Sequence, residues 1–436
     1  MPDAAPPVIS ARLLPPGDGD PVRFRRVTVV DGTGAPPVPG QWVLVEHGRI
    51  AALGPEPAGH GGTCSRLTDI DASGCALLPG LINCHVHLCN DGPPDLLRQV
   101  QSDKVPLATL RAVRNLALTL RSGVTTVRDC GAADGIAIAL AQAEADGVIV
   151  GPRIVAAGRV ITMTGGHGHF MGLESDGADA VCRSVRTEMK GGAHFIKAMA
   201  TGGVLTPGVE PDHGGLSASE LLAVARTAHE SGRRTACHAI GGRGIKNALR
   251  AGIDSIEHGF HLDDEALQLA IDQGTFLVPT LVAIESILDH DQDGVMPDFV
   301  VRKARAEAGA HHEAFARAVA AGVRIAAGTD AGTPFNPHSD LPRELQLMVR
   351  LGMSAGQAIA AATSQAAANL DLGHSVGTVE AGKVADLLLV EGDPTADIGA
   401  LTQVAAVMRA GRLVHDSGRR APQAVPGSAR AEPATL

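Results

Sequence analysis

The 436-residue sequence contains no tyrosine and one tryptophan, and aromatic residues make up only 2% of it. A tyrosine hydroxyl is therefore excluded as a catalytic acid or as a group that grips a substrate. Alanine and the aliphatic residues must fill the core instead. With 44% hydrophobic and 19% charged residues, the composition is that of a globular protein long enough for a large core.

Long apolar segments and basic segments are also missing. No run of about 18 or more uncharged apolar residues occurs, so no membrane span is expected. The net charge is −10 without a Lys/Arg-rich run, which argues against nucleic acid and anionic membranes as partners. The Pro/Gly-rich N-terminus lacks a basic-then-apolar signal pattern, and a cytoplasmic location is expected by default.

The seven cysteines form no C-x-x-C pair, and their odd number and irregular spacing favour reduced thiols. Cys84 and Cys89 flank the histidines of the sequence GLINCHVHL. We interpret these two cysteines first as small apolar wall residues and second as metal ligands.

The middle of the chain alternates between strand-like and helix-like segments. The strand-like segments are 80–88, 124–131, 152–158, 193–203, 233–242, 254–259, 275–281 and 323–332. Strands that alternate with helices imply a parallel sheet, and eight such units predict a closed (β/α)8 TIM barrel over residues 80–374.

The two ends of the chain are rich in short strand patterns separated by Gly turns. Residues 23–79 and 375–416 are expected to form one small β-sandwich domain built from both chain ends. The fold class is thus α/β, a barrel with a composite β domain. Residues 1–22 and 417–436 are expected to be flexible tails.

Metal-capable side chains stand at the C-terminal ends of five predicted strands, where a barrel carries its functional site. They are His85, His87, Lys197, His238, His258 and Asp330. Each alone has a structural explanation: a satisfied core histidine, a lysine packed on the wall, or an aspartate that caps a turn. Together at one barrel mouth they predict a divalent-metal site, because imidazole and carboxylate are good Zn²⁺ ligands.

The lysine needs a separate explanation, because its charge is costly to bury and an ammonium cannot coordinate a metal. A lysine carbamate, formed with CO₂, presents two carboxylate-like oxygens and can bridge two ions. We infer this role for Lys197 and expect two divalent metal ions, Zn²⁺ first. Such ions would lower the pKa of a bridging water, and Asp330 would accept its proton.

In this order, the HVH strand, Lys197, His238, His258 and Asp330 resemble the amidohydrolase superfamily. The stretches LLPGLINCHVHL, GGHGHF, FIKAMATGGVLTPG and AGTDAG resemble one subgroup of it. That subgroup contains imidazolonepropionase-like hydrolases and Xaa-Pro or Xaa-Arg dipeptidases, together with enzymes that act on carbamates, phenylureas and mycotoxin amides. The resemblance covers residues 23–416.

The resemblance implies a binuclear metal-dependent amidohydrolase that cleaves a C–N bond in a dipeptide, an N-acyl amino acid or a small amide, carbamate or urea. It assigns His85, His87 and Asp330 to the more buried ion and His238 and His258 to the more exposed one, with carbamylated Lys197 bridging. Asp330 would carry a proton from the metal-activated hydroxide to the leaving amine. The resemblance also implies a homo-oligomer.

Three further residues are candidates for contacts around the site. His167, in the Gly-rich GGHGH loop, is expected to hydrogen-bond a substrate carbonyl or carboxylate, or else it is a histidine of a flexible loop. His213 in EPDHGG is expected over the barrel mouth, in contact with substrate. Asp129 either orients a ligand histidine or caps the next turn.

Other functions remain as alternatives. A mononuclear deaminase on this barrel places a glutamate three residues after the fifth-strand histidine, where this chain has Gly241, and leaves Lys197 without a role. A non-enzymatic scaffold predicts broken ligand sets, whereas all six candidates are present. Dipeptide cleavage requires a group that binds the C-terminal carboxylate of the substrate, and His167, Arg159 or Arg243, or backbone amides could supply it. The missing tyrosine favours a less polar amide as the substrate.

Overall fold

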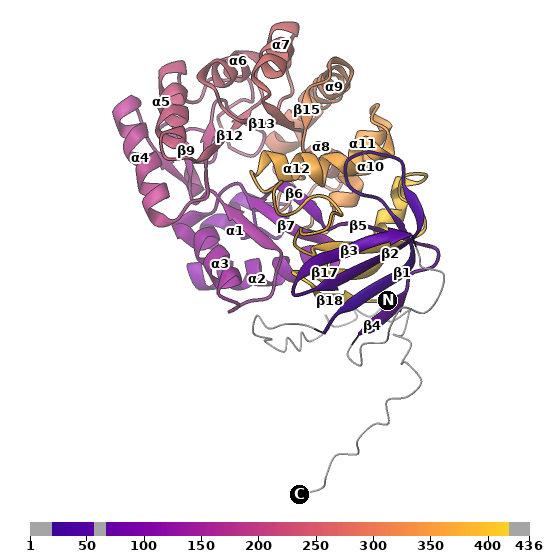
Figure 1. Ribbon diagram of the computed structural model, residues 1–436. Coiled ribbons are helices and arrows are strands. Elements are labelled where there is room, and N and C mark those ends of the chain that lie inside the picture. Colours follow the sequence, from indigo (N-terminus) through magenta and orange to yellow (C-terminus); the bar gives the residue numbers. More distant parts are fainter. Residues whose placement is uncertain (1–19, 56–66, 418–436) are drawn as a thin grey trace, which may run out of the picture.

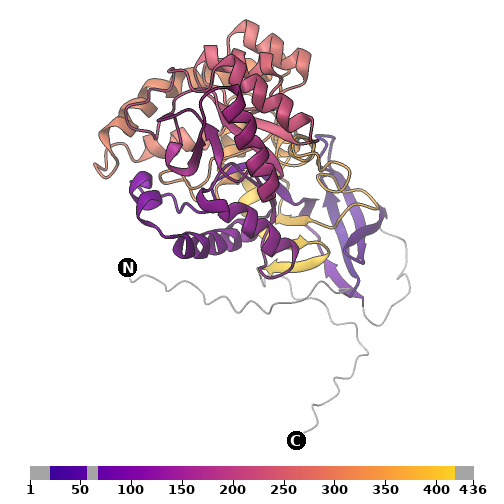
Figure 2. The same cartoon turned by 90° about the vertical axis from the view of Figure 1, so that its left-hand side faces the viewer.

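The computed structural model describes residues 20–55 and 67–417, and almost all of the expected tails lies outside these residues. Figure 1 shows a barrel wrapped by helices beside a β domain that combines both ends of the chain. In the perpendicular view of Figure 2, strands from the two chain ends again lie together below the barrel helices. The fold is therefore α/β, with a barrel and an attached β domain.

The β domain is one mixed sheet with strand order β18-β17-β16-β5-β1-β2-β3, and β4 also pairs with β1. Its strands are β1 (Val22–Val29), β2 (Val38–Glu46), β3 (Arg49–Pro55), β4 (Thr68–Asp71), β5 (Cys75–Pro79), β16 (Leu387–Glu391), β17 (Val404–Arg409) and β18 (Arg412–Asp416). The two chain ends join where β5 pairs antiparallel with β16, with Leu77 opposite Leu389. The continuous sheet folds around an apolar core that includes Phe24, Val43 and Met408.

The barrel strands are parallel. They are β6 (Leu81–Val86), β7 (Val124–Asp129), β8 (Arg153–Ala156), β9 (Val160–Thr162), β11 (Phe195–Met199), β12 (Arg234–Ala239), β13 (Ser255–His258), β14 (Phe276–Val278) and β15 (Arg324–Ile325), and β10 (Gly172–Glu174) pairs with β9. The third strand is split: β8 pairs with β7, and β9 pairs with β11. Its two parts are separated at Gly158, whose φ is +76°.

The ring closes between the eighth strand and the first. The N–H of Cys84 donates to the carbonyl of Ala327 (2.8 Å), the N–H of His87 donates to the carbonyl of Ala331 (2.9 Å), and Val86 forms a parallel bridge with Ala331. These contacts extend the eighth strand beyond β15 and place residue 330 beside the end of β6. The predicted (β/α)8 barrel is confirmed.

Helices cover the outside of the barrel (Figure 1). They are α1 (Leu96–Ser102), α2 (Val105–Arg121), α3 (Ile136–Ala145), α4 (Ala178–Gly191), α5 (Ala218–His229), α6 (Gly242–Ala251), α7 (Asp264–Gln273), α8 (Leu281–Asp289), α9 (Asp298–Ala321), α10 (Leu341–Arg350), α11 (Ala355–Ala361) and α12 (Ser364–Asn369). Helix α5 begins with the reciprocal hydrogen bonds of Ser217 and Glu220, the capping box expected from sequence. Within the described residues, no helix has the length and apolarity to span a bilayer.

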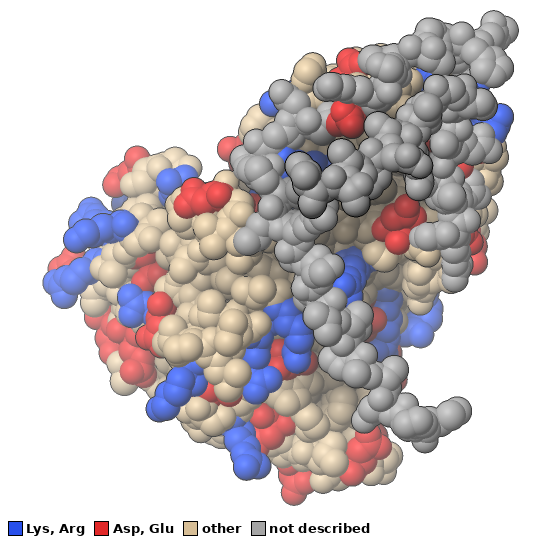
Figure 3. All heavy atoms as spheres, turned by 90° about the horizontal axis from the view of Figure 1, so that it is seen from below, with Lys and Arg blue, Asp and Glu red and all other residues tan. Residues whose placement is uncertain are grey.

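The main core between strands and helices consists mainly of Ala, Val, Leu and Ile, as the low aromatic content requires. Among the described residues, Phe315 is its one aromatic member. On the face shown in Figure 3, acidic and basic side chains are intermixed.

A buried ionic network joins the β domain to the barrel. Asp386, next to the start of β16, accepts hydrogen bonds from Arg153 of β8 (3.1 Å) and from Arg409 of β17 (3.3 Å). Arg409 also donates to Glu144 of α3 (2.8 Å), and the N–H of Ala410 donates to Asp386 (2.7 Å). The Asp386 side chain is 2% exposed, so its charge depends on these partners.

Replacing Asp386 by alanine should remove the acceptor of the Arg153 guanidinium and of the Ala410 N–H, and leave Arg409 with Glu144 alone. We expect D386A to lower the free energy of unfolding by about 3 kcal/mol, as for other broken buried ion pairs. Denaturant unfolding followed by circular dichroism measures this, with exposed Glu313→Ala on α9 as the control. Equal stability of D386A and E313A would contradict the role of this network.

Candidate functional site

One cavity at the C-terminal ends of the barrel strands collects all six predicted ligands. Its lining includes His85, His87, Lys197, His238, His258 and Asp330. They come from β6, β11, β12, β13 and the segment after β15, and His87 follows β6 directly. Residues more than 240 positions apart in the chain therefore face one space.

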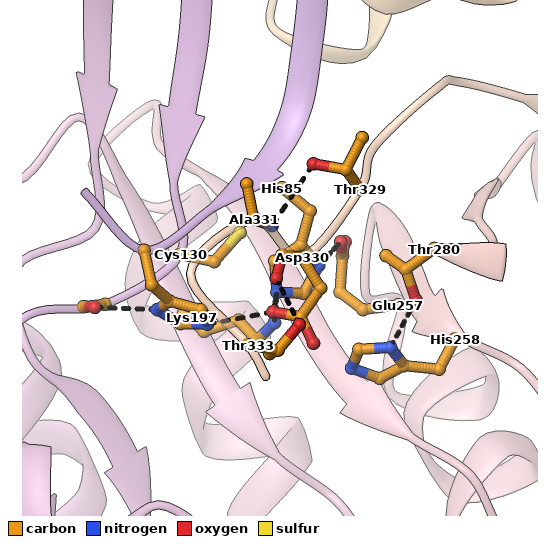
Figure 4. A network of polar contacts seen from close by, with 12 residues as sticks. His85, Cys130, Lys197, Glu257, His258, Thr280, Thr329, Asp330, Ala331 and Thr333 are labelled. Atoms are coloured by element: carbon orange, nitrogen blue, oxygen red, sulfur yellow. Dashed lines mark hydrogen bonds and ion pairs between the residues drawn. The ribbon is translucent and has the colours of Figure 1, made fainter. Parts of the chain in front are cut away.

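The four imidazoles are packed against one another. Ring centroids are 5.5 Å apart for His85 and His87, 5.1 Å for His85 and His258, and 4.5 Å for His238 and His258. Asp330 Oδ1 lies 3.2 Å from His87 Nε2 and 3.4 Å from His85 Nε2. Lys197 Nζ also lies 3.4 Å from His85 Nε2 (Figure 4).

Each of these histidines has one ring nitrogen held by a neighbour. Nδ1 of His85 contacts Glu257 (2.8 Å), Nδ1 of His87 the carbonyl of Gly131 (2.8 Å), Nδ1 of His258 the hydroxyl of Thr280 (2.8 Å), and Nε2 of His238 the carbonyl of Gly202 (2.7 Å). The other nitrogen of each ring remains available to an ion. This arrangement is typical of metal-ligating histidines, whose second nitrogen fixes the tautomer and the ring orientation.

The donor set fits a divalent metal. Asp330 Oδ1 is buried and makes no hydrogen bond, and the ligand atoms of His85, His258 and Asp330 all lie within 4.8 Å of one another. A buried carboxylate oxygen without a donor is costly unless a cation satisfies it. The backbones of His258 (φ +73°) and Asp330 (φ +58°) are left-handed, and such strain is concentrated at functional sites.

Burial keeps most of these imidazoles neutral, which is the form that binds metals. Burial, reinforced by the Lys197 ammonium, lowers the pKa of His85 to about 4. Burial also lowers the pKa of His238 and of His258 well below the usual range. His87 differs: burial opposes its protonation, but the Asp330 carboxylate 3.2 Å away raises its pKa.

Comparison with known proteins identifies the family. The sequence model of the amidohydrolase family matches residues 76–414 of this chain. The chain is 30% identical to ochratoxinase of Aspergillus niger over 94% of this chain and 87% of that protein. It superposes on a Xaa-Pro dipeptidase solved with bound methionine, with a TM-score of 0.84 and 32% identity over 90% of this chain and 99% of that one.

The chain belongs to the amidohydrolase family. It is a hydrolase that acts on carbon–nitrogen bonds in small molecules, and the family is generally metal-dependent. The crystal structure of A. niger ochratoxinase has the same fold, with a TM-score of 0.81 and 27% identity over 92% of this chain and 97% of that one.

Sequence reasoning missed the ion pair beneath the amidohydrolase site. Glu257 of β13 is fully buried, and its second oxygen accepts from Arg128 of β7 (2.7 Å). Although burial alone would raise the pKa of Glu257, Arg128 and then His85 hold it below its ordinary value. The available signal was a charged residue inside each of two strands that were expected to lie within the barrel, because such residues are rarely buried unpaired.

His167 reaches the cavity as expected, and its ring centroid lies 4.3 Å from that of His238. Its Nδ1 lies 2.8 Å from the Thr206 hydroxyl. Asp129 caps the turn after β7, as one of its two predicted roles requires: it accepts from the N–H of Leu88 (2.9 Å) and from the N–H of Gly131 (3.0 Å). The carbonyl of the same Gly131 holds His87.

His213 is not among the residues that line the cavity, and it is exposed on the loop after β11. Neither Cys84 nor Cys89 lines the cavity, which agrees with their interpretation as packing residues.

Away from the six candidates, the cavity wall is mainly apolar. It includes Leu96, Phe170, Met171, Met199, Val204, Leu205, Ile240, Phe260, Ala283, Ile284 and Ile287. Among the described lining residues, Lys197 is the one lysine, and no arginine is present. Arg159 instead pairs with buried Glu188 (2.9 Å).

Glu257→Gln removes a negative charge that has two roles: it holds His85, and it balances the positive charge of Arg128. Because second-layer partners orient ligand histidines, we expect E257Q to weaken metal binding by about 10- to 100-fold. Competition with a chelator, followed by metal analysis, measures this. Glu188→Gln is the matched control, since Glu188 is also a buried partner of an arginine but contacts no candidate ligand. Equal metal affinity in both variants would contradict the role of Glu257.

Proposed function

We propose that the protein is a binuclear metal-dependent amidohydrolase that cleaves an amide-type C–N bond of a dipeptide, an N-acyl amino acid or a small amide, carbamate or urea. The observation that carries the proposal is that four oriented imidazoles line one cavity together with Asp330, whose buried Oδ1 atom has no hydrogen-bond donor. The named relatives, an ochratoxinase and a Xaa-Pro dipeptidase, support amide hydrolysis.

His85, His87 and Asp330 would hold the more buried ion, and His238 and His258 the more exposed one. Carbamylated Lys197 would bridge them, which explains why a lysine 1% exposed lies beside the Nε2 atom of His85. Zn²⁺ suits this imidazole and carboxylate set. When bound, the ions would supply Lewis acidity and lower the pKa of a water molecule.

Asp330 is the proton carrier of the proposal. Its carboxylate faces both His85 and His87, so it is in place to accept a proton from the attacking water. The same carboxyl group would then deliver the proton to the leaving nitrogen. No other carboxylate lines the cavity among the described residues.

His167 would orient the substrate carbonyl. The Thr206 hydroxyl accepts from the N–H of Gly168 (3.3 Å), and in this proposal it donates its own proton to Nδ1 of His167 (2.8 Å). Burial lowers the pKa of His167 to about 3, so the ring is neutral and carries its one proton on Nε2. That N–H is a donor suited to a carbonyl oxygen.

The deaminase alternative is less well supported. It requires a glutamate where this chain has Gly241, and a Cβ atom at that position would lie 2.9 Å from the backbone of Asp212. A longer side chain at this place needs movement of the backbone. Hydrolysis uses the residues that are present, including Lys197.

Lys197→Ala should lose the bridging oxygens and with them the metal. We expect a loss of at least about 1000-fold in kcat, measured together with metal content by mass spectrometry. Added acetate should restore part of both, because a small carboxylate supplies the two missing oxygens. The exposed Lys190→Ala serves as a control. A metal-replete, fully active K197A would contradict the proposed bridge.

A pair of substrates that differ in one group tests the substrate class. N-benzoylphenylalanine carries a carboxylate, and N-(2-phenylethyl)benzamide lacks it. Because the wall is apolar, we expect kcat/KM to be at least about 10-fold higher for the uncharged amide. A preference for the acid would instead support dipeptides or N-acyl amino acids, with His167 or loop amides as the grip.

A further inference from the structure

Lys303 of α9 is a buried cation outside the cavity lining. Its side chain is 1% exposed, and its ammonium donates to the carbonyls of Gly203 (3.1 Å), Thr206 (2.8 Å) and Val209 (2.7 Å). An ammonium has three N–H donors, so all of them are used. Lys303 therefore has no donor left for a substrate, and its effect on the site must pass through the loop that it holds.

The loop of residues 203–209 follows β11 and needs an external anchor. Backbone hydrogen bonds close the base of the longer connection, from Gly202 to His213 (2.8 Å) and from His213 to Glu210 (3.0 Å). The middle of the loop contains Pro207, which has no N–H. The three bonds from Lys303 supply donors to the carbonyls of buried Gly203 and Thr206 and of half-buried Val209.

This loop contacts the candidate site in three ways. Val204 and Leu205 form part of the cavity wall. The Thr206 hydroxyl holds His167, and Gly203 lies so close to that ring that an added Cβ atom would be 2.4 Å from His167 Cε1.

The residue just before the loop extends this contact to a candidate ligand. The carbonyl of Gly202 accepts from Nε2 of His238 (2.7 Å). The backbone position of residues 202–206 thus fixes a wall, a carbonyl-orienting histidine and a candidate metal ligand together.

We propose that Lys303 is a positioning residue that sets the substrate cavity by fixing the 203–209 loop from behind. Apolar groups surround much of its side chain: Val300 and Ala304 of α9 belong to the same cluster as Val204, and the Phe299 ring centroid lies 5.4 Å from Nζ. The Glu210 carboxylate at the end of the loop also acts on its charge. Burying a charge there is unfavourable unless every donor is used. An apolar side chain would pack equally well but would not direct the three carbonyls.

Lys303→Met keeps the length of the side chain and removes its donors. We expect KM to rise by about 10-fold or more, because small displacements of positioning groups have large kinetic effects. The kcat/KM ratio between amides with large and small acyl groups should move towards one. The metal content should stay unchanged, because Gly202, whose carbonyl holds His238, is bonded to His213 at the base of the loop and not to Lys303. A lysine that only supports the fold would lower kcat equally for all substrates by reducing the active fraction.

Arg302→Met is a matched control on the same helix. Arg302 forms an exposed ion pair with Glu210 at the end of the same loop (2.6 Å), so KM should stay within about two-fold. Lys303→Gln retains an amide donor and should give an intermediate rise in KM. If K303M does not fold, K303Q decides by the same measurements.

The kinetic test rests on the proposed function, but the position of the loop does not. Hydrogen–deuterium exchange of the 203–209 amides should be at least about 10-fold faster in K303M than in R302M. A folded K303M or K303Q with wild-type KM, substrate ratio and exchange would overturn the proposal. If no amide is hydrolysed by the wild type, the proposed function fails and the exchange result alone decides the role of Lys303.

Discussion

The site depends on a buried chain of contacts from Arg128 through Glu257 to His85. Arg128 donates to the carbonyl of Cys84 (2.6 Å), to Ser255 (3.0 Å) and to Glu257, and thereby links β6, β7 and β13 inside the barrel. Neither charge can be lost alone without leaving the other buried and unpaired. Because Glu257 holds Nδ1 of His85, this electrostatic constraint directs Nε2 of the same ring towards Asp330, and the metal-binding arrangement follows from it.

A second constraint is the close approach of the eighth strand to the first. A Cβ atom at Gly328 would lie 2.9 Å from the Cβ atom of His85 and 2.5 Å from Val278, so only glycine allows this approach. The N–H of Asp330 then donates to the carbonyl of His85 (2.8 Å). In this placement the backbone of Asp330 adopts a strained, left-handed conformation. The carboxylate then lies against the imidazoles of His85 and His87.

The sequence predicted the barrel and the gathering of its six candidate residues because each lies on a predicted barrel strand or directly after it, which is a local property. It did not predict Glu257, Thr280 or Lys303, whose roles arise from contacts between elements far apart in the chain. The run 152–158 was expected to be one strand, but the barrel strand divides at Gly158 and continues as β9. His213 was expected at the cavity but does not line it. The course of its loop depends on long-range anchors that no local pattern reveals.

The contacts between the 203–209 loop and the site indicate that the main chain and the side chains of this segment serve different roles, one in orienting catalytic groups and the other in shaping the substrate cavity. The carbonyl of Gly202 orients His238, and the carbonyls of Gly203, Thr206 and Val209 are bound by Lys303. All of these bonds use the main chain. The side chains of Val204 and Leu205 are therefore free to change without loss of any of them. Substitutions at these two positions alter the shape offered to the substrate while the backbone that orients the metal-binding histidine stays in place.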